Sequence, residues 1–163
     1  YNFMNFYQSL GFLFFGTRLK RLSEAYLNDV NKIYKKHNIG FDASWFPVFY
    51  IIAEHGEVSI RQISNELRIS HSAASQMVSS LQQKGFIKST VSKSDARHKV
   101  VAFTAKGQKL LLKVQPVWTA LQQAMEELSN ETAQSKKILD ALTALENNLQ
   151  HSGVYERVEN KMK

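Results

Sequence analysis

Residues 59–85 read SIRQISNELRISHSAASQMVSSLQQKG. Ser59, with Gln62 three residues later, fits a helix N-cap, and Ser70 fits a second one. Apolar residues at helical spacing follow each cap, and Gly85 can end the second helix in a left-handed conformation. The stretch therefore predicts two short helices that are joined by a tight turn.

After Gly85 the helical periodicity gives way to strand-like composition. Residues 86–91 and 99–103 are rich in β-branched and aromatic side chains, which predicts two strands. The polar residues 92–98 between them predict a β-hairpin with a long charged tip. Two short helices followed by such a hairpin indicate a winged helix-turn-helix.

Amphipathic helices are predicted on both sides of this unit. Residues 1–37 show helical apolar spacing, and Gly40 is expected to supply a left-handed cap beyond them. Ser44 is a candidate N-cap for an apolar second helix, and Thr104 for a long helix that follows the hairpin. A last helix is expected over residues 131–150.

These elements predict a mainly α fold with a small β-hairpin wing. Residues 41–104 would form the winged helix-turn-helix lobe, and residues 1–40 and 105–163 the dimerisation helices. In an isolated chain the last helix would expose a row of leucines, which favours a second copy as partner: Leu139, Leu142, Leu145 and Leu149.

Composition excludes several classes of protein. The chain of 163 residues has no cysteine, which excludes disulfides, thiolate metal sites and cysteine-based redox sensing. The apolar run at residues 10–16 is too short to span a bilayer and does not resemble a signal peptide. We therefore expect a cytoplasmic protein with no membrane segment.

Positive charge is concentrated in the middle of the chain. The formal net charge is +7, and residues 61–113 alone, with ten Lys/Arg and two Asp/Glu, carry +8. A localised basic block is expected of a surface that contacts phosphates, although a solvated basic face without a partner shows the same charge.

The helix that follows Ser70 is the candidate DNA-reading element. Its outward positions are small, polar and uncharged, whereas an ordinary solvated helix is rich in Glu, Lys and Arg. Hydroxyls and amides can read base edges in the major groove, and a serine-rich surface helix without this role is the alternative. The candidate DNA contacts on this element are Ser70, His71, Ser72, Ser75, Gln76 and Ser79.

The predicted wing adds a second set of candidate DNA contacts. Lys93, Arg97 and Lys99 lie at or beside its tip, where an arginine can enter a narrow minor groove. Asp95 can orient Arg97 through a charge-assisted hydrogen bond. An ordinary salt bridge within the turn would explain the same pair.

Together these features resemble the MarR family of bacterial regulators. The resemblance rests on the order of the helices, on Asp95-Ala96-Arg97-His98-Lys99 and on the step Phe103-Thr104-Ala105-Lys106-Gly107, in which Phe103 stands where the family usually has leucine. It implies a homodimeric transcription factor that binds a pseudo-palindromic double-stranded DNA operator, and it favours a repressor.

The resemblance also implies a small aromatic or acidic effector. Candidate pocket residues are aromatic, although aromatic side chains at helical spacing are also typical of a plain core. An acidic effector would pair with Arg18 or Arg21. The candidates are Phe12, Phe15, Trp45, Phe49 and Trp118.

Catalysis is not expected. The five histidines lack metal-ligand spacing, and neither a nucleophile motif nor a phosphate-binding glycine loop is present. We expect no cofactor and no metal. The competing interpretation is a winged helix that binds another protein and no operator, but such modules commonly carry an acidic reading helix or an uncharged wing.

Overall fold

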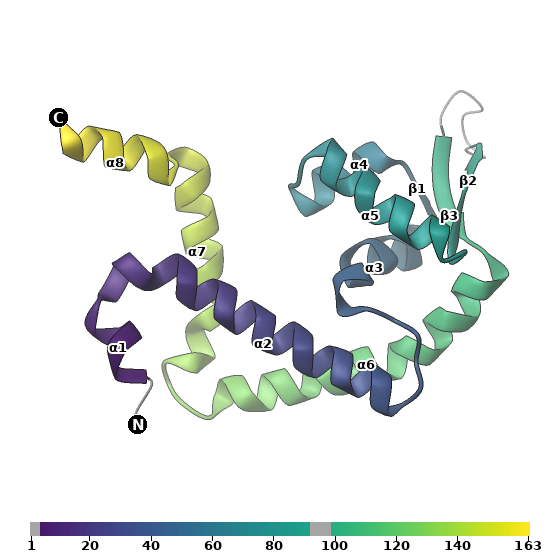
Figure 1. Ribbon diagram of the computed structural model, residues 1–163, viewed down its shortest axis with the longest axis horizontal. Coiled ribbons are helices and arrows are strands. Elements are labelled where there is room, and N and C mark those ends of the chain that lie inside the picture. Colours follow the sequence, from purple (N-terminus) through teal and green to yellow (C-terminus); the bar gives the residue numbers. More distant parts are fainter. Residues whose placement is uncertain (1–3, 92–98) are drawn as a thin grey trace. The chain divides into compact units, whose positions relative to one another are not determined.

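A computed structural model describes residues 4–91 and 99–163 of the chain. The chain forms two compact units, Tyr1–Val117 and Trp118–Lys163, and the long helix α6 (Ala105–Asn130) contributes residues to both. Helices dominate, as the sequence predicts, and one small antiparallel sheet accompanies them (Figure 1). Within the described residues, no helix combines the length and the apolar composition that crossing a membrane requires.

The first unit begins with a broken helix. Residues 1–37 do not form the single helix that their periodicity predicts, because α1 (Met4–Ser9) ends before a 3-10 turn (Gly11–Phe14), and α2 (Phe15–Lys36) follows. Gly11 has a φ of +52°, a left-handed conformation that a glycine adopts without a Cβ penalty and that an α-helix cannot contain.

The segment that joins α2 to α3 (Phe46–His55) also differs from the prediction. Asn38, with a φ of 53°, takes the left-handed position that was expected for Gly40. Ser44 does not cap α3, whose N-cap residue Trp45 makes no side-chain capping hydrogen bond. Asp42 instead caps the preceding 3-10 turn Ala43–Trp45, because its carboxylate accepts a 2.8 Å hydrogen bond from the Ser44 backbone N–H. Both differences from the prediction have a chemical reason, since asparagine tolerates the left-handed region and aspartate is a strong N-cap.

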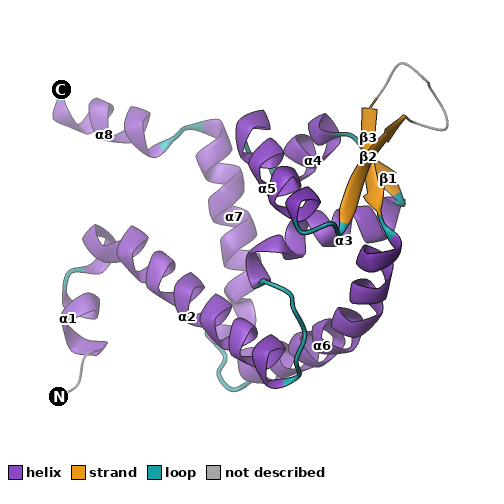
Figure 2. Cartoon of the chain, turned by 45° about the vertical axis from the view of Figure 1, so that its right-hand side comes forward, coloured by secondary structure: helices purple, strands orange, loops and turns teal. Residues whose placement is uncertain are grey.

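The helix-turn-helix consists of α4 (Ile60–Leu67) and α5 (His71–Gln83). One strand of a three-stranded sheet precedes it in the chain, and the other two strands follow it. The predicted hairpin is present as β2 (Ile87–Val91) and β3 (Lys99–Phe103), which pair antiparallel from Ile87 opposite Phe103 to Val91 opposite Lys99. A third strand, β1 (Glu57–Val58), pairs with the other edge of β3, so the order is β1-β3-β2 (Figure 2).

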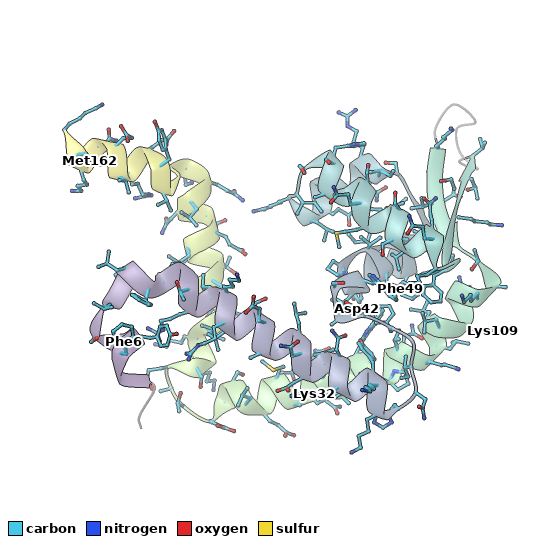
Figure 3. The ribbon with its side chains drawn as sticks, viewed as in Figure 1. Phe6, Lys32, Asp42, Phe49, Lys109 and Met162 are labelled. Carbon is cyan, nitrogen blue, oxygen red and sulfur yellow. The ribbon has the colours of Figure 1, made fainter. Side chains whose placement is uncertain are left out.

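Aromatic rings form the core of the first unit. Phe49 lies on α3 (Figure 3) and is fully buried. Its ring centroid lies 4.5 Å from that of Phe103 on β3 and 5.0 Å from that of Phe41. Phe41 in turn packs edge-on against Tyr34 of α2, at 5.1 Å. The chain of rings therefore joins α2, α3 and the sheet, and gives the helix-turn-helix a rigid base.

The second unit contains the rest of α6, the 3-10 turn Ser135–Lys137, α7 (Ile138–His151) and α8 (Val154–Met162). The last predicted helix thus begins seven residues later than expected, because Thr132 and Ser135 hold a capped turn with a 3.0 Å hydrogen bond from the Ser135 N–H to the Thr132 hydroxyl. Arg157 of α8 donates to the carbonyl oxygens of Asn148 and Ser152 at 3.2 and 2.9 Å.

Candidate nucleic-acid interface

The turn between α4 and α5 is held by two hydrogen bonds between Ser64 and Ile69, one from the backbone and one from a side chain. Arg68 adopts a left-handed conformation with a φ of 53°. The backbone N–H of Ile69 donates to the Ser64 carbonyl oxygen at 3.1 Å, and the Ser64 hydroxyl donates to the Ile69 carbonyl oxygen at 2.8 Å. The two helices are therefore connected by a short, well-bonded turn, and the Arg68 side chain is exposed at its corner.

Both predicted serine caps are confirmed. The Ser59 hydroxyl accepts from the Gln62 N–H at 3.1 Å, and the Ser70 hydroxyl accepts from the Ala73 N–H at 3.1 Å. The Gln62 side chain does not return to the cap, as a full capping box requires, but donates to Glu66 at 2.9 Å. Ser70 thus fixes where α5 begins and which face of it is buried.

The buried face of α5 is apolar and its outward face is polar. Ala74, Val78 and Leu81 are almost fully buried. Among the candidate DNA contacts, Ser75 is half-buried, and five are exposed: Ser70, His71, Ser72, Gln76 and Ser79. The structure therefore places these six candidates on one surface element.

Of the candidate DNA contacts on the wing, Lys99 lies within the described residues. Lys99 opens β3 opposite Val91 and is exposed. Lys93, Asp95 and Arg97 lie in residues 92–98, outside the described part of the chain, so their predicted roles stay predictions.

Acidic charge is held away from α5. Glu66 is the only acidic residue between positions 58 and 94. Its carboxylate lies 3.3 Å from His55 Nε2 at the end of α3 and accepts the hydrogen bond from Gln62. The reading helix itself carries no carboxylate, which would repel phosphates.

Three exposed cations near these elements were not singled out from the sequence. Arg61 lies in the first turn of α4, Arg68 at the turn, and Lys88 on β2, and all three are exposed. The signal for them was present in the +8 charge of residues 61–113, but charge alone did not indicate which lysines and arginines lie on the helix-turn-helix and wing.

Three of the predicted effector residues line two separate hollows. Phe12 and Phe15, whose ring centroids are 6.1 Å apart, line a hollow of about 320 Å³ with Arg18. Trp45 lines a separate groove of about 600 Å³ with Lys35 and Lys84.

The other two predicted pocket residues lie elsewhere. Phe49 is fully buried in the ring core, and Trp118 belongs to the second unit. Arg21 does not line the hollow but lies over the Tyr7 ring, 4.7 Å from its centroid. No cluster of three His, Cys, Asp or Glu side chains in the described residues is arranged to hold a metal ion.

Comparison with known proteins agrees with this geometry. A sequence model of the MarR family matches residues 39–98. Over this segment the chain is similar to the MarR family. The segment contains α3, β1, α4, α5 and β2, and it ends immediately before β3. A comparison with curated proteins found no match.

Solved structures with the MarR-family fold cover most of the chain. A MarR/EmrR family transcriptional regulator from Acinetobacter sp. ADP1 is 18% identical over 83% of this chain and 94% of that one, with a TM-score of 0.65. Staphylococcus aureus MepR in complex with DNA is 17% identical over 83% and 97%, with a TM-score of 0.67. Staphylococcus aureus MarR with salicylate and kanamycin is 23% identical over 88% and 95%, with a TM-score of 0.62. The similarity therefore extends beyond the matched segment to the fold of the flanking helices.

Proposed function

We propose that this protein is a dimeric transcriptional regulator that binds a specific double-stranded DNA operator. The observation that carries the proposal is the exposed face of α5. That face is rich in hydroxyl and amide groups, and α5 contains no Asp or Glu. Exposed arginines and lysines lie nearby on α4, on the turn and on the strands. Hydroxyls and amides fit base edges in the major groove, while the surrounding cations supply phosphate affinity.

Two structural neighbours support nucleic acid as the partner. MepR of Staphylococcus aureus was solved as a DNA complex, and a MarR variant of Escherichia coli was solved with operator DNA. In our proposal Gln76 and the serines of α5 read bases, and Arg97 of the wing, oriented by Asp95, contacts the minor groove with Lys93 and Lys99 beside it.

Dimerisation is supported by apolar side chains that are exposed outside the winged helix. In the second unit Leu139 is 73% exposed and Tyr155 is 77% exposed, and α2 exposes Leu22 at 62%. Apolar exposure on this scale marks an interaction surface, and the simplest partner of such a face is a second copy with two-fold symmetry. A two-fold dimer predicts half-sites about one helical turn apart, ~34–36 Å.

We further propose that the protein is a repressor and that an aromatic acid releases it. The hollow beside Phe12 and Phe15 supports this proposal, because it is mostly apolar and has the guanidinium of Arg18 at its wall. Salicylate, the compound bound to the Staphylococcus aureus MarR structure, is the natural first probe. Salicylate should raise the melting temperature of the wild type but not of Arg18→Gln; no shift with salicylate or other aromatic acids would contradict the effector.

The first experiment is selection from a random duplex library at about 150 mM salt, where non-specific binding is weak. An inverted repeat in the enriched pool supports a dimeric operator-binding regulator. Gln76→Ala should then relax sequence preference, whereas Arg97→Ala should weaken binding to all sequences and lower the salt dependence. An unenriched pool contradicts operator binding and favours a winged helix that binds another protein.

The dimer is tested separately by sedimentation. Leu139→Glu should shift the wild-type dimer toward monomer, because a carboxylate is costly to bury at an apolar interface. Val91→Glu is the matched control, since Val91 is also an exposed apolar residue, at 57%, but lies on β2. A monomeric wild type would contradict the dimer.

A further inference from the structure

The end of α5 presents three consecutive backbone carbonyls that its own helix does not use. The helix ends at Gln83, Lys84 is its C-cap, and Gly85 turns the chain with a φ of +73° into β2. The last carbonyls of a helix lack intrahelical partners and must accept hydrogen bonds from elsewhere. The last carbonyls of α5, those of Ser80, Leu81 and Gln82, accept from the N–H groups of Lys84, Phe86 and Gly85. Three further carbonyls, those of Lys84, Gly85 and Phe86, accept from outside this turn.

The start of α6 supplies a donor to each of these carbonyls. The Lys106 ammonium donates to the Lys84 oxygen at 2.7 Å, the Thr104 hydroxyl donates to the Gly85 oxygen at 2.7 Å, and the Thr104 backbone N–H donates to the Phe86 oxygen at 2.9 Å. α5 leads into β2, and β3 leads into α6, at the same end of the sheet (Figure 1). The end of α5 is thus bonded to the start of α6.

Close backbone packing reinforces these bonds. A Cβ on Gly107 would lie 2.0 Å from the Phe86 carbonyl oxygen, so the first turn of α6 touches the backbone at the end of α5. The Thr104 hydroxyl also accepts from the Gly107 N–H at 3.1 Å, which makes Thr104 the N-cap of α6 as well. The Lys106 ammonium lies 4.8 Å from the centre of the Phe86 ring.

We propose that Thr104 and Lys106 are positioning residues that hold α5 at a fixed angle to α6 and thereby set the operator spacing that the protein accepts. This inference rests on the proposed function, in which α6 leads from the reading helix to the dimerisation helices. In a two-fold dimer the distance between the two copies of α5 depends on the angle at this joint. The part of α6 that belongs to the first unit, Ala105–Val117, has 13 residues, so it is about 20 Å long, and a change of about 10° at its start displaces its end by roughly 3.4 Å. That displacement corresponds to about one base-pair step of ~3.4 Å.

The test measures binding to duplexes that contain the selected half-sites at centre-to-centre spacings varied in single base pairs. Wild type should prefer one spacing. Thr104→Val, which keeps the shape and removes the hydroxyl, and Lys106→Met, which removes the ammonium, should each reduce the preference over the neighbouring spacings by about three- to tenfold, the factor that one hydrogen bond can contribute. Thr104→Ser, which keeps the hydroxyl, should restore the wild-type preference.

A stability control separates positioning from folding. Val58→Ala truncates a side chain that is 1% exposed on β1, which contributes none of the hydrogen bonds of the joint, and should lower the melting temperature without changing the spacing preference. Lys106 has an exposed side chain, so Lys106→Met tests the joint even if Thr104→Val fails to fold. An unchanged spacing preference in folded Lys106→Met would contradict only the proposal that the joint sets the operator spacing. A wild type that binds no duplex would contradict both this proposal and the proposed function.

Discussion

Gln82 of α5 donates a hydrogen bond of 2.8 Å from its side-chain amide to the hydroxyl of Ser89 on β2. The pair joins the reading helix directly to the first strand of the wing, beside the turn at Gly85. Because the two residues are only seven positions apart and lie on different elements, the bond restrains the hairpin with respect to the helix. Under the proposed function, this bond favours a fixed orientation of the wing with respect to the reading helix.

A double-mutant cycle should detect this bond. Gln82→Ala and Ser89→Ala are each expected to lower the free energy of unfolding, and the double variant should lose less than the sum by about 0.5–1 kcal/mol. Urea unfolding of the four proteins measures the coupling. Gln83→Ala, which changes an exposed neighbour, serves as the control and should show no coupling with Ser89→Ala.

Glycine at position 107 should be far less replaceable than glycine at position 16. Gly107→Ala would place a methyl 2.0 Å from the Phe86 carbonyl oxygen, and is expected to destabilise the protein by about 3 kcal/mol. Gly16 lies inside α2 with nothing within 4 Å of the added Cβ, so Gly16→Ala should stabilise by roughly 0.5–1 kcal/mol. Thermal unfolding compares them, and equal effects would contradict the close packing at Gly107.

The cap at the start of α5 should matter more than the serine two residues later. Ser70→Ala removes the acceptor for the Ala73 N–H and is expected to cost about 1 kcal/mol of stability. Ser72→Ala changes an exposed position beyond the cap and should leave the free energy of unfolding within about 0.5 kcal/mol of the wild type. A similar loss in both variants would argue against Ser70 as the cap.

Local sequence signals were sufficient for much of the helix-turn-helix and for its candidate face. Ser59, Ser70 and Thr104 are N-caps as predicted, and the hairpin strands lie where β-branched and aromatic residues gather. These features depend on neighbours within a few residues, so a single sequence contains the information. The buried stripe of α5 then determined which side chains are outward.

Features that depend on tertiary context were missed or misplaced. β1 has two residues, too short to show any alternation, and exists because β3 pairs with it. Gly11 interrupts apolar spacing that otherwise fits one helix, and an isolated glycine there does not reveal its φ in advance. The burial of Phe49 in the ring core is likewise not evident from the sequence, since aromatic spacing alone cannot separate a pocket wall from a core.

Tyr26 should make stability depend on pH in the alkaline range. Tyr26 is 41% exposed, and the partial burial of its phenol raises its pKa above the usual value, because the phenolate is less well solvated there than in water. A pKa that is higher in the folded protein gives a contribution that is complete below the unfolded pKa of about 10 and is lost as the pH rises through the folded pKa. Tyr26→Phe should lose less stability than the wild type between pH 9 and about 11.

The control for this measurement is Tyr155→Phe, at a ring that is 77% exposed. Its stability should follow the wild-type curve over the same alkaline range, because removing a solvated phenol changes little. Parallel curves for the wild type and Tyr26→Phe would contradict the effect of burial at Tyr26.

Replacing Arg68 by glycine should lower DNA affinity without lowering the stability of the protein. Its φ of 53° is costly for a residue with a Cβ and is free of that cost for glycine, so Arg68→Gly is expected to leave the free energy of unfolding unchanged or raise it by up to about 1 kcal/mol. Under the proposed function the same change removes an exposed cation at the corner of the helix-turn-helix. Affinity for every duplex should therefore fall. The slope of log affinity against log salt concentration should become shallower by about 0.9, the value for the loss of one phosphate contact.

Asn38→Gly is the matched variant for Arg68→Gly. Asn38 has the same φ of 53° but lies after α2, outside the helix-turn-helix, so its replacement should affect stability in the same direction and leave the salt slope unchanged. Differential scanning calorimetry and salt titrations of both variants give the comparison. If Arg68→Gly kept the wild-type slope, Arg68 would not contact phosphate, and the corner of the turn would point away from the DNA.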